Sequence, residues 1–154
     1  MAGILRLLLP AARLWWRIRK PRTLGVRAVA LDPDERIVLV RHTYADPWYL
    51  PGGGVDRWES CADAVRRELE EEAGLAEARI ERILGVYHNT SESKDDHIVA
   101  FVVRVDAAPL RPTDKLEIAE ARWFPLDGLP DNASPATLRR IAEYRAGAVG
   151  TGDW

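Results

Sequence analysis

Hydrophobic residues follow two different periods along this chain, and the change of period separates predicted strands from predicted helices. Residues 24–31 are mostly apolar, and residues 37–40 form an unbroken apolar run of mainly β-branched side chains. Such a run is expected to be a strand buried on both faces of a sheet. Residues 48–50 form a short extended segment, which ends at a proline and a run of three glycines.

Two later segments have the start and stop signals of helices. Ser60 is a good N-cap and Gly74 fits the left-handed position after a last turn, so a helix is predicted over residues 61–73. Its apolar seam consists of Val65, Leu69 and Ala73. A last helix begins at Ser134 with Pro135 in its first position, where a missing N–H is harmless. The residues expected to face the core from it are Leu138, Ile141 and Ala142.

The remaining periodic segments are strands. Residues 80–88 and 97–105 are predicted to pair through a polar hairpin loop, and residues 121–124 form a further short strand after a proline-containing loop. Residues 147–154 are expected to be a frayed tail. The pattern therefore divides the chain into an N-terminal arm over residues 1–22, one domain over residues 23–147 and a tail over residues 148–154.

The N-terminal arm differs from the rest of the chain in its charge. Seven basic residues and no acidic one precede Asp32, whereas the remainder carries 15 basic and 24 acidic residues. Within residues 11–20, helical spacing places Ala11, Leu14, Trp15 and Ile18 opposite Arg13, Arg17 and Lys20. Such a helix fits either peripheral contact with an anionic membrane or packing on the domain or on a second subunit. No nucleic-acid-reading module accompanies it, so no specific nucleic-acid partner is expected.

Composition bounds the class of protein. The chain has 154 residues, of which 47% are hydrophobic and 30% charged, and this is typical of a single globular domain. The apolar run that precedes Pro10 is far too short for a membrane-spanning helix. Cys61 is the only cysteine, so no internal disulfide can form and a cytoplasmic location is expected.

The helix over residues 61–73 carries the candidate chemistry. Glu68 lies three and four positions before Glu71 and Glu72, so the three carboxylates share one face. The general interpretation of such a face is a solvated acidic surface. The alternative is a site for a hard divalent cation, because Mg²⁺ prefers oxygen ligands and would relieve the repulsion among the carboxylates. The preceding glycines would let the backbone approach an anion or a metal closely.

The spacing around this helix resembles that of the Nudix hydrolase family. The 23 residues from Gly53 to Leu75 fit the pattern GX5EX7REUXEEXGU, in which U is a bulky aliphatic residue, at every fixed position. The matching residues are Gly53, Glu59, Arg67, Glu68, Leu69, Glu71, Glu72, Gly74 and Leu75. The resemblance implies an α/β fold: an α/β/α sandwich with a mixed sheet, in which the patterned segment forms a loop, a helix and a second loop.

The resemblance also implies an activity and a set of metal ligands. Nudix proteins hydrolyse a diphosphate linked to another moiety, usually in a nucleoside diphosphate derivative, with Mg²⁺ or Mn²⁺. By position, Glu68 and Glu72 correspond to the first metal ligands and Glu71 to a third ligand or a base. The carbonyl of Gly52 corresponds to a backbone ligand.

Further catalytic residues are expected on the same basis. Arg67 and Glu59 correspond to a pair that orients the helix. Many family members take another glutamate from a late loop, for which Glu117 is the first candidate and Glu120 the second. A solvated loop carboxylate is an equally reasonable interpretation of either residue.

Several aromatic rings could stack on a nucleotide base, because every base has a face that an aromatic ring accepts. The candidates are Tyr44, Trp48, Trp58 and Tyr87, of which at least two are expected to pack in the core or at its rim. Gly53 is a further candidate for substrate contact. Trp58 occupies a position where the family often has glycine.

The analysis leaves the substrate open and keeps two alternatives to an enzyme. One is a Nudix-fold binding or regulatory module without turnover, and the other is a membrane-surface protein in which the basic arm is the main functional element. A small-molecule nucleotide is the expected substrate, and a homodimer is compatible with the family.

Overall fold

The computed structural model describes residues 22–90 and 95–154 of the chain. The helix expected over residues 11–20 lies outside the described residues, as does most of the hairpin loop. The elements in chain order are β1 (Arg22–Leu31), β2 (Arg36–His42), β3 (Trp48–Tyr49), α2 (Cys61–Ala73), β4 (Ala78–Asn89), β5 (Asp95–Val105), β6 (Ile118–Pro125), α3 (Pro135–Arg145) and β7 (Gly150–Asp153).

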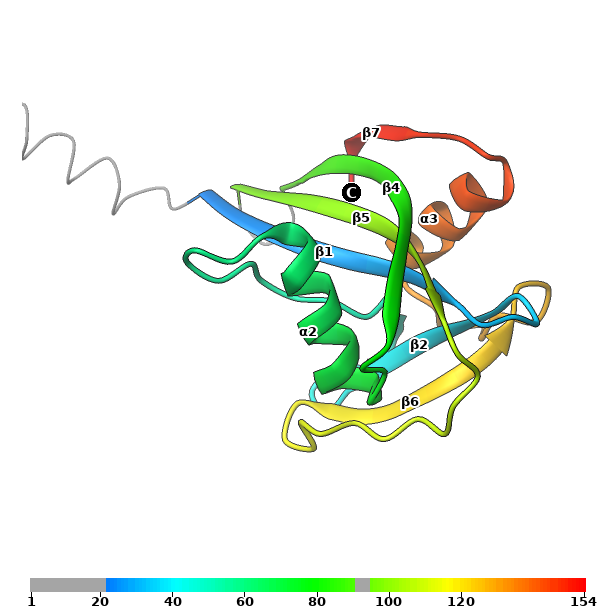
Figure 1. The fold of residues 1–154 in the computed structure, drawn as a ribbon. Helices are drawn as coiled ribbons and strands as arrows, with labels where there is room; N and C mark the ends of the chain where they lie inside the picture. Colours follow the sequence, from blue (N-terminus) through cyan, green and yellow to red (C-terminus); the bar gives the residue numbers. More distant parts are fainter. Residues whose placement is uncertain (1–21, 91–94) are drawn as a thin grey trace, which may run out of the picture.

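These strands form one mixed sheet with a helix on either side (Figure 1). The strand order is β3-β2-β1-β5-β4-β7, and β6 pairs with β2 beside this path. Strands β1 and β5 are parallel, whereas β4 and β5 form the antiparallel hairpin that the sequence predicts. The architecture is therefore of the expected α/β/α type.

The two faces of β1 supply two separate cores. Val26 and Ala28 pack on the α2 side, in a cluster that contains the predicted helix seam. Val29 and Leu31 pack on the α3 side with Ile141. Alternate residues of a strand point to opposite faces, so a strand covered on both sides needs a continuous apolar sequence. Residues 37–40 are all fully buried in the same way, as predicted.

Helix α2 begins and ends where its capping residues predict. The Ser60 side chain accepts a hydrogen bond from the Asp63 backbone N–H at 3.1 Å. Gly74 adopts φ 74°, and its N–H donates to the carbonyl of Glu70. Leu75 follows as a buried residue whose N–H reaches the Leu69 carbonyl at 3.1 Å. These local interactions make the orientation of the helix face predictable from sequence.

Two expectations for the C-terminal part of the chain are wrong. The segment expected to fray contains β7, which pairs in parallel with β4. Helix α3 buries Thr137, Arg140 and Ile141, whereas Leu138 and Ala142 are exposed. The buried stripe of α3 thus contains an arginine and a threonine that hydrophobic periodicity cannot select. Among the described residues, no helix has the length and apolar character needed to cross a membrane.

Candidate active site

The glycine run before α2 lies directly against β1. The backbone N–H groups of Val26 and Ala28 donate to the carbonyls of Gly53 and Pro51, both at 2.9 Å. Gly52 lies between these two carbonyls with φ 142°, and a Cβ there would overlap the carbonyl oxygen of Val26. Only glycine fits this conformation and this close approach. The segment is thereby held between β1 and the helix that follows it.

Glu72 is the carboxylate most deeply enclosed by this arrangement. Glu72 is only 5% exposed, and its Oε2 accepts a hydrogen bond from the Gly52 backbone N–H at 2.8 Å. Burial raises the pKa of the Glu72 carboxyl to about 8, against the opposing effects of the Gly52 N–H and the Arg27 charge. A buried carboxyl with a pKa in this range is a typical functional-site feature, because it needs a cation to ionise fully at neutral pH.

Glu68 lies one turn earlier and packs on Gly53. A Cβ at Gly53 would come within 2.5 Å of the Glu68 Oε1, so the absence of a side chain there makes room for the carboxylate. Burial raises the pKa of Glu68, and the hydrogen bond from Arg67 at 2.7 Å opposes this shift. The two carboxylates predicted as metal ligands are therefore both pressed against the glycine segment.

Arg67 connects the loop with the helix face. Its Nε and one terminal nitrogen bind the two oxygens of Glu59 at 2.8 and 2.9 Å, a paired geometry that also lowers the pKa of Glu59 to about 2. The same guanidinium donates to the Gly54 carbonyl at 2.9 Å and to Glu71 at 3.2 Å. The Glu71 side chain is 46% exposed. These contacts support the positional role expected for Arg67.

The loop that carries Glu117 is tied to two other elements. The Thr113 N–H donates to the carbonyl of Glu71 near the end of α2, and the Thr43 N–H, just after β2, donates to the carbonyl of Glu117. The Asp114 side chain accepts the Glu117 N–H at 3.1 Å. Backbone hydrogen bonds to the helix and to the strand therefore bring this distant glutamate to the patterned segment.

A group that could hold a metal ion results from this convergence. Ligand atoms of His42, Glu72 and Glu117 all lie within 4.8 Å of one another. Among the described residues, the His42 Nδ1 is a buried atom without a hydrogen-bond partner, and it lies 3.7 Å from the Glu117 Oε1. The Tyr44 hydroxyl donates to that same oxygen at 3.3 Å, and its ring stacks on His42 with centroids 5.2 Å apart.

The sequence did not identify His42 or Arg27 as site residues. His42 was expected to be a histidine satisfied by its neighbours, and Arg27 was counted only as one charge of a basic region. Neither residue belongs to a spaced motif, so only the pairing of β2 with β6 and the position of β1 bring them to the glutamates.

The other predicted site residues are more scattered. Glu120 does not join the cluster, because it pairs with Arg41 at 3.1 Å and with Arg122. Trp58 is 96% exposed with φ 69°.

Trp48 is 6% exposed and packs edge-on against Phe124 in the core. Its predicted role in stacking on a base is therefore wrong, since a core ring has no free face. Tyr87 is also a core residue, at 1% exposure, as expected for at least two of the four aromatic candidates.

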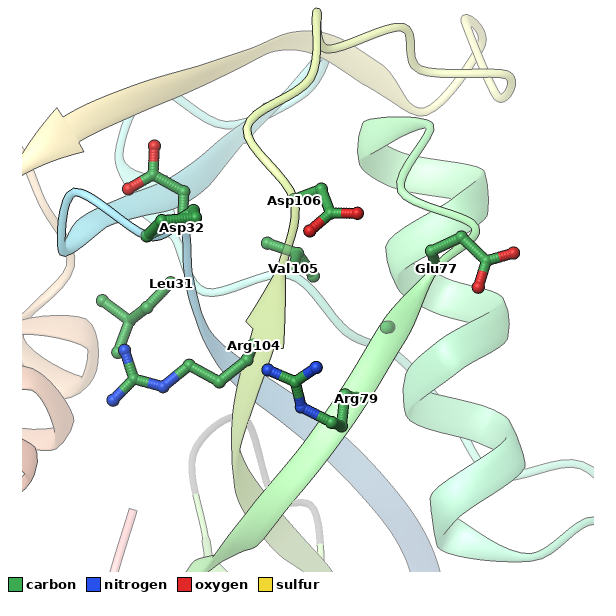
Figure 2. A pocket seen from close by; sticks show the side chains of 9 residues that line it. Leu31, Asp32, Glu77, Arg79, Arg104, Val105 and Asp106 are labelled. Carbon is green, nitrogen blue, oxygen red and sulfur yellow. The ribbon is translucent and has the colours of Figure 1, made fainter.

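A separate pocket of about 360 Å³ lies where β1, β4 and β5 meet their adjoining loops (Figure 2). Arg79 and Arg104 occupy paired positions on β4 and β5 and line it together with Asp32. Arg104 is already engaged by Glu35 and Glu81. Glu68, Glu71 and Glu72 do not line this pocket, so we do not assign the active site to it.

Comparisons with known proteins agree with the family resemblance of the segment from Gly53 to Leu75. A family model described as "NUDIX domain" matches residues 21–144. The ADP-ribose pyrophosphatase of Methanocaldococcus jannaschii is 32% identical over 112 residues, which cover 67% of this chain and 64% of that protein. The diphosphoinositol polyphosphate phosphohydrolase 2 of Rattus norvegicus is 30% identical over 95 residues, or 61% of this chain, and the match spans about half (51%) of that protein.

A solved structure also resembles most of the fold. The crystal structure of a MutT NUDIX hydrolase from Burkholderia pseudomallei superimposes with a TM-score of 0.62 and is 29% identical. It covers 80% of this chain, and this chain covers 98% of the solved one.

Glu72→Gln is expected to stabilise the metal-free protein at alkaline pH. The folded-state pKa of about 8 exceeds the ordinary value of 4.5, so protonated Glu72 contributes stability that is full below pH 4.5 and lost as pH rises through 8. Glutamine stays neutral and removes this loss. Thermal melts with a chelator between pH 5 and 9 should show a flatter profile for Glu72→Gln than for Glu70→Gln, an exposed position on the same helix. A steeper or unchanged profile would contradict the assignment.

Arg67→Ala is expected to lower the free energy of unfolding by about 1–2 kcal/mol, because it removes several charge-assisted hydrogen bonds from a partly exposed group. The matched control is Arg66→Ala, whose side chain is more exposed and makes only long contacts. Denaturant unfolding of both variants measures the difference. Equal stability of the two would show that Arg67 does not hold the loop to the helix.

Proposed function

The chain belongs to the Nudix family of enzymes that act on phosphoric anhydrides, and on that premise we propose that it hydrolyses the diphosphate bond of a nucleoside diphosphate linked to another moiety. The observation that carries this proposal is the pair of carboxylates packed against the glycine segment: Glu72, which is buried, and Glu68, whose side chain is 12% exposed. An enclosed carboxylate such as Glu72, which Arg67 does not contact, is costly unless a cation joins it.

The donors present fit a hard divalent cation, which we propose to be Mg²⁺, with Mn²⁺ as a substitute. Glu68 and Glu72 would hold it, and Glu71 or the carbonyl of Gly52 would complete the protein ligands. Both carbonyls that flank Gly52 accept hydrogen bonds from β1, so its own carbonyl is the one not used in that pairing. Oxygen ligands in small number, with phosphate oxygens of the substrate added, are the usual magnesium environment.

When bound, the cation would neutralise charge on the diphosphate and acidify a water molecule. The protein must then accept a proton as the water oxygen attacks phosphorus and the bridging oxygen departs with the leaving phosphate. We assign this proton to Glu117, whose Oε1 receives the Tyr44 hydroxyl at 3.3 Å and lies close to His42. Arg67 would act by positioning Glu68 and Glu71.

The relatives support small phosphorylated substrates without identifying one. Their names specify ADP-ribose and diphosphoinositol polyphosphates, which differ in their organic part and have a diphosphate linkage in common. Tyr44, Trp58 and the backbone of Gly53 are the groups that we propose for substrate contact near the metal. Tyr44 is 74% exposed and Trp58 is 96% exposed, so both rings are accessible.

The predictions about location and assembly come from the amino-acid sequence. A cytoplasmic location, a homodimer and contact of residues 1–22 with a membrane surface stay predictions.

Glu72→Gln is expected to reduce kcat by at least about 10²-fold, as for other electrostatic groups at phosphoryl-transfer sites. The assay is a panel of ADP-ribose, nucleoside triphosphates, dinucleoside polyphosphates, nucleotide sugars and diphosphoinositol compounds with Mg²⁺ or Mn²⁺, followed by phosphate or nucleotide release. Glu70→Gln is the control on the same helix. Near-normal turnover by Glu72→Gln would refute the metal assignment, and an inactive wild type that still binds panel compounds would favour a binding module.

Glu117→Gln is expected to slow turnover by about 10²-fold, as for loss of a general base, with little change in metal-free stability. Glu120→Gln is the matched variant from the same region, and its carboxylate is engaged by two arginines. If Glu120→Gln has the larger effect, the choice between the two loop glutamates is wrong. If neither variant slows turnover, Glu71 becomes the base.

A further inference from the structure

The C-terminal segment is built into the fold next to the proposed site. Strand β7 (red in Figure 1) pairs with β4 from Gly150 to Asp153. The backbone N–H of Trp154 then donates to the His88 carbonyl at 2.9 Å. A residue that the hydrophobic pattern assigned to a loose tail therefore has a defined position on the sheet.

A buried arginine holds the Trp154 ring in place. Arg140 is 2% exposed, and its guanidinium carbon lies 3.8 Å from the centroid of the Tyr87 ring and 5.2 Å from that of Trp154. It also donates to the Asp153 carbonyl at 3.3 Å and to Glu143 at 2.8 Å. Arginine between aromatic rings gains stabilisation that increases when the group is desolvated. Few alternative orientations of Trp154 would keep these contacts.

Two glycines make this arrangement sterically possible. The Tyr87 side chain lies over Gly85 and Gly150, and a Cβ on either glycine would overlap its ring or hydroxyl. The Tyr87 hydroxyl passes beyond them to donate to Glu143 at 2.6 Å. Gly150 is thus a position at which a larger residue would separate the tail from the sheet.

Trp154 lines a cleft of about 430 Å³ whose chemistry differs from that of the metal face. Arg27, Tyr49 and Arg139 line it too, together with the first turn of α3. Within the described part of the chain, no aspartate or glutamate lines this cleft. Two arginines and two aromatic rings, with no aspartate or glutamate among the described lining residues, suit a ligand that is both planar and anionic, and Arg139 also donates to the backbone oxygen of Trp154.

Arg27 links this cleft to the glutamates. It also lines an adjacent groove of about 220 Å³ with Gly53 and Gly54, and its charge lowers the pKa values of Glu68 and Glu72. A substrate whose diphosphate lies at the metal face can therefore extend past Arg27 into the cleft.

We propose that Trp154, held by Arg140, is the stacking wall of a subsite that accepts the base of a nucleotide, with Arg27 facing its phosphates. The subsite rests on the proposed function for its place in catalysis, but binding tests it separately. Base stacking on an aromatic ring is tolerant of base identity, so Trp154 contributes affinity for a base in general.

The test is calorimetric binding of AMP, GMP, CMP, UMP and inorganic phosphate to the full chain in the presence of Mg²⁺. Wild type is expected to bind at least one nucleotide more tightly than phosphate. Trp154→Ala should weaken that nucleotide by about tenfold and leave phosphate unchanged, whereas Trp154→Phe should keep most of the affinity. Val149→Ala is the control, because Val149 lies just before β7, is 74% exposed and does not line the cleft.

A second variant tests the tail as a unit. Gly150→Val should reproduce the selective loss seen with Trp154→Ala, because its side chain would collide with Tyr87. With any hydrolysed substrate, Trp154→Ala should raise KM and keep kcat within about twofold, the signature of lost binding that is equal in ground and transition states.

The proposal is overturned if Trp154→Ala binds nucleotides as tightly as wild type does. It is also overturned if wild type binds none of the four nucleotides more tightly than it binds inorganic phosphate. Failure of the proposed function looks different: the substrate panel is not hydrolysed, yet the nucleotide preference and its loss in Trp154→Ala persist.

Discussion

A hydrogen bond of 2.8 Å from the Gly52 backbone N–H to the buried Glu72 carboxylate joins the glycine segment to helix α2. It requires α2 to lie directly on the glycine segment, and it requires a backbone conformation that favours glycine. Separation of the two would leave a buried carboxylate without its donor, which is among the costlier defects in a protein interior. The position of Glu68 against Gly53 follows from the same contact.

The glutamates at the site differ in whether a positive charge contacts them. Arg67 binds Glu59, Glu68 and Glu71 through one guanidinium, so those three have a permanent counter-charge. Glu72 has no such basic partner in direct contact among residues 22–90 and 95–154, and burial raises its pKa. The site therefore retains one enclosed carboxylate without a counter-charge in direct contact among the described residues, as the proposed cation site requires.

The residues around these glutamates differ in charge from one side of the site to the other. On one side, Glu117 and His42 add further metal-type donors. On the other side, Arg27 and Trp154 both line a cleft in which none of the described lining residues is an aspartate or a glutamate. An acidic centre beside a basic, aromatic cleft is consistent with the proposed nucleotide, whose phosphates would be bound by the proposed cation and by Arg27.

Sequence alone determined the features that depend on neighbouring residues. The caps at Ser60 and Gly74, the apolar seam of α2 and the shared face of its glutamates follow from interactions within a few positions. The spacing from Gly53 to Leu75 also identified the family, because every one of its parts lies on one loop and one helix. Burial of residues 37–40 on both faces of the sheet was predictable for the same reason, since an unbroken apolar run is a local pattern.

Tertiary structure decided what depends on contacts between distant residues. Tyr44 and Glu117 are 73 positions apart and meet only because the late loop binds both α2 and the end of β2. The tail of the chain is ordered by a buried arginine, and α3 turns that arginine inward while Leu138 stays exposed, the reverse of its hydrophobic pattern. Periodicity measures the cost of exposing apolar groups, whereas a buried charge is stabilised by partners that no local pattern specifies, so these positions were settled only by folding.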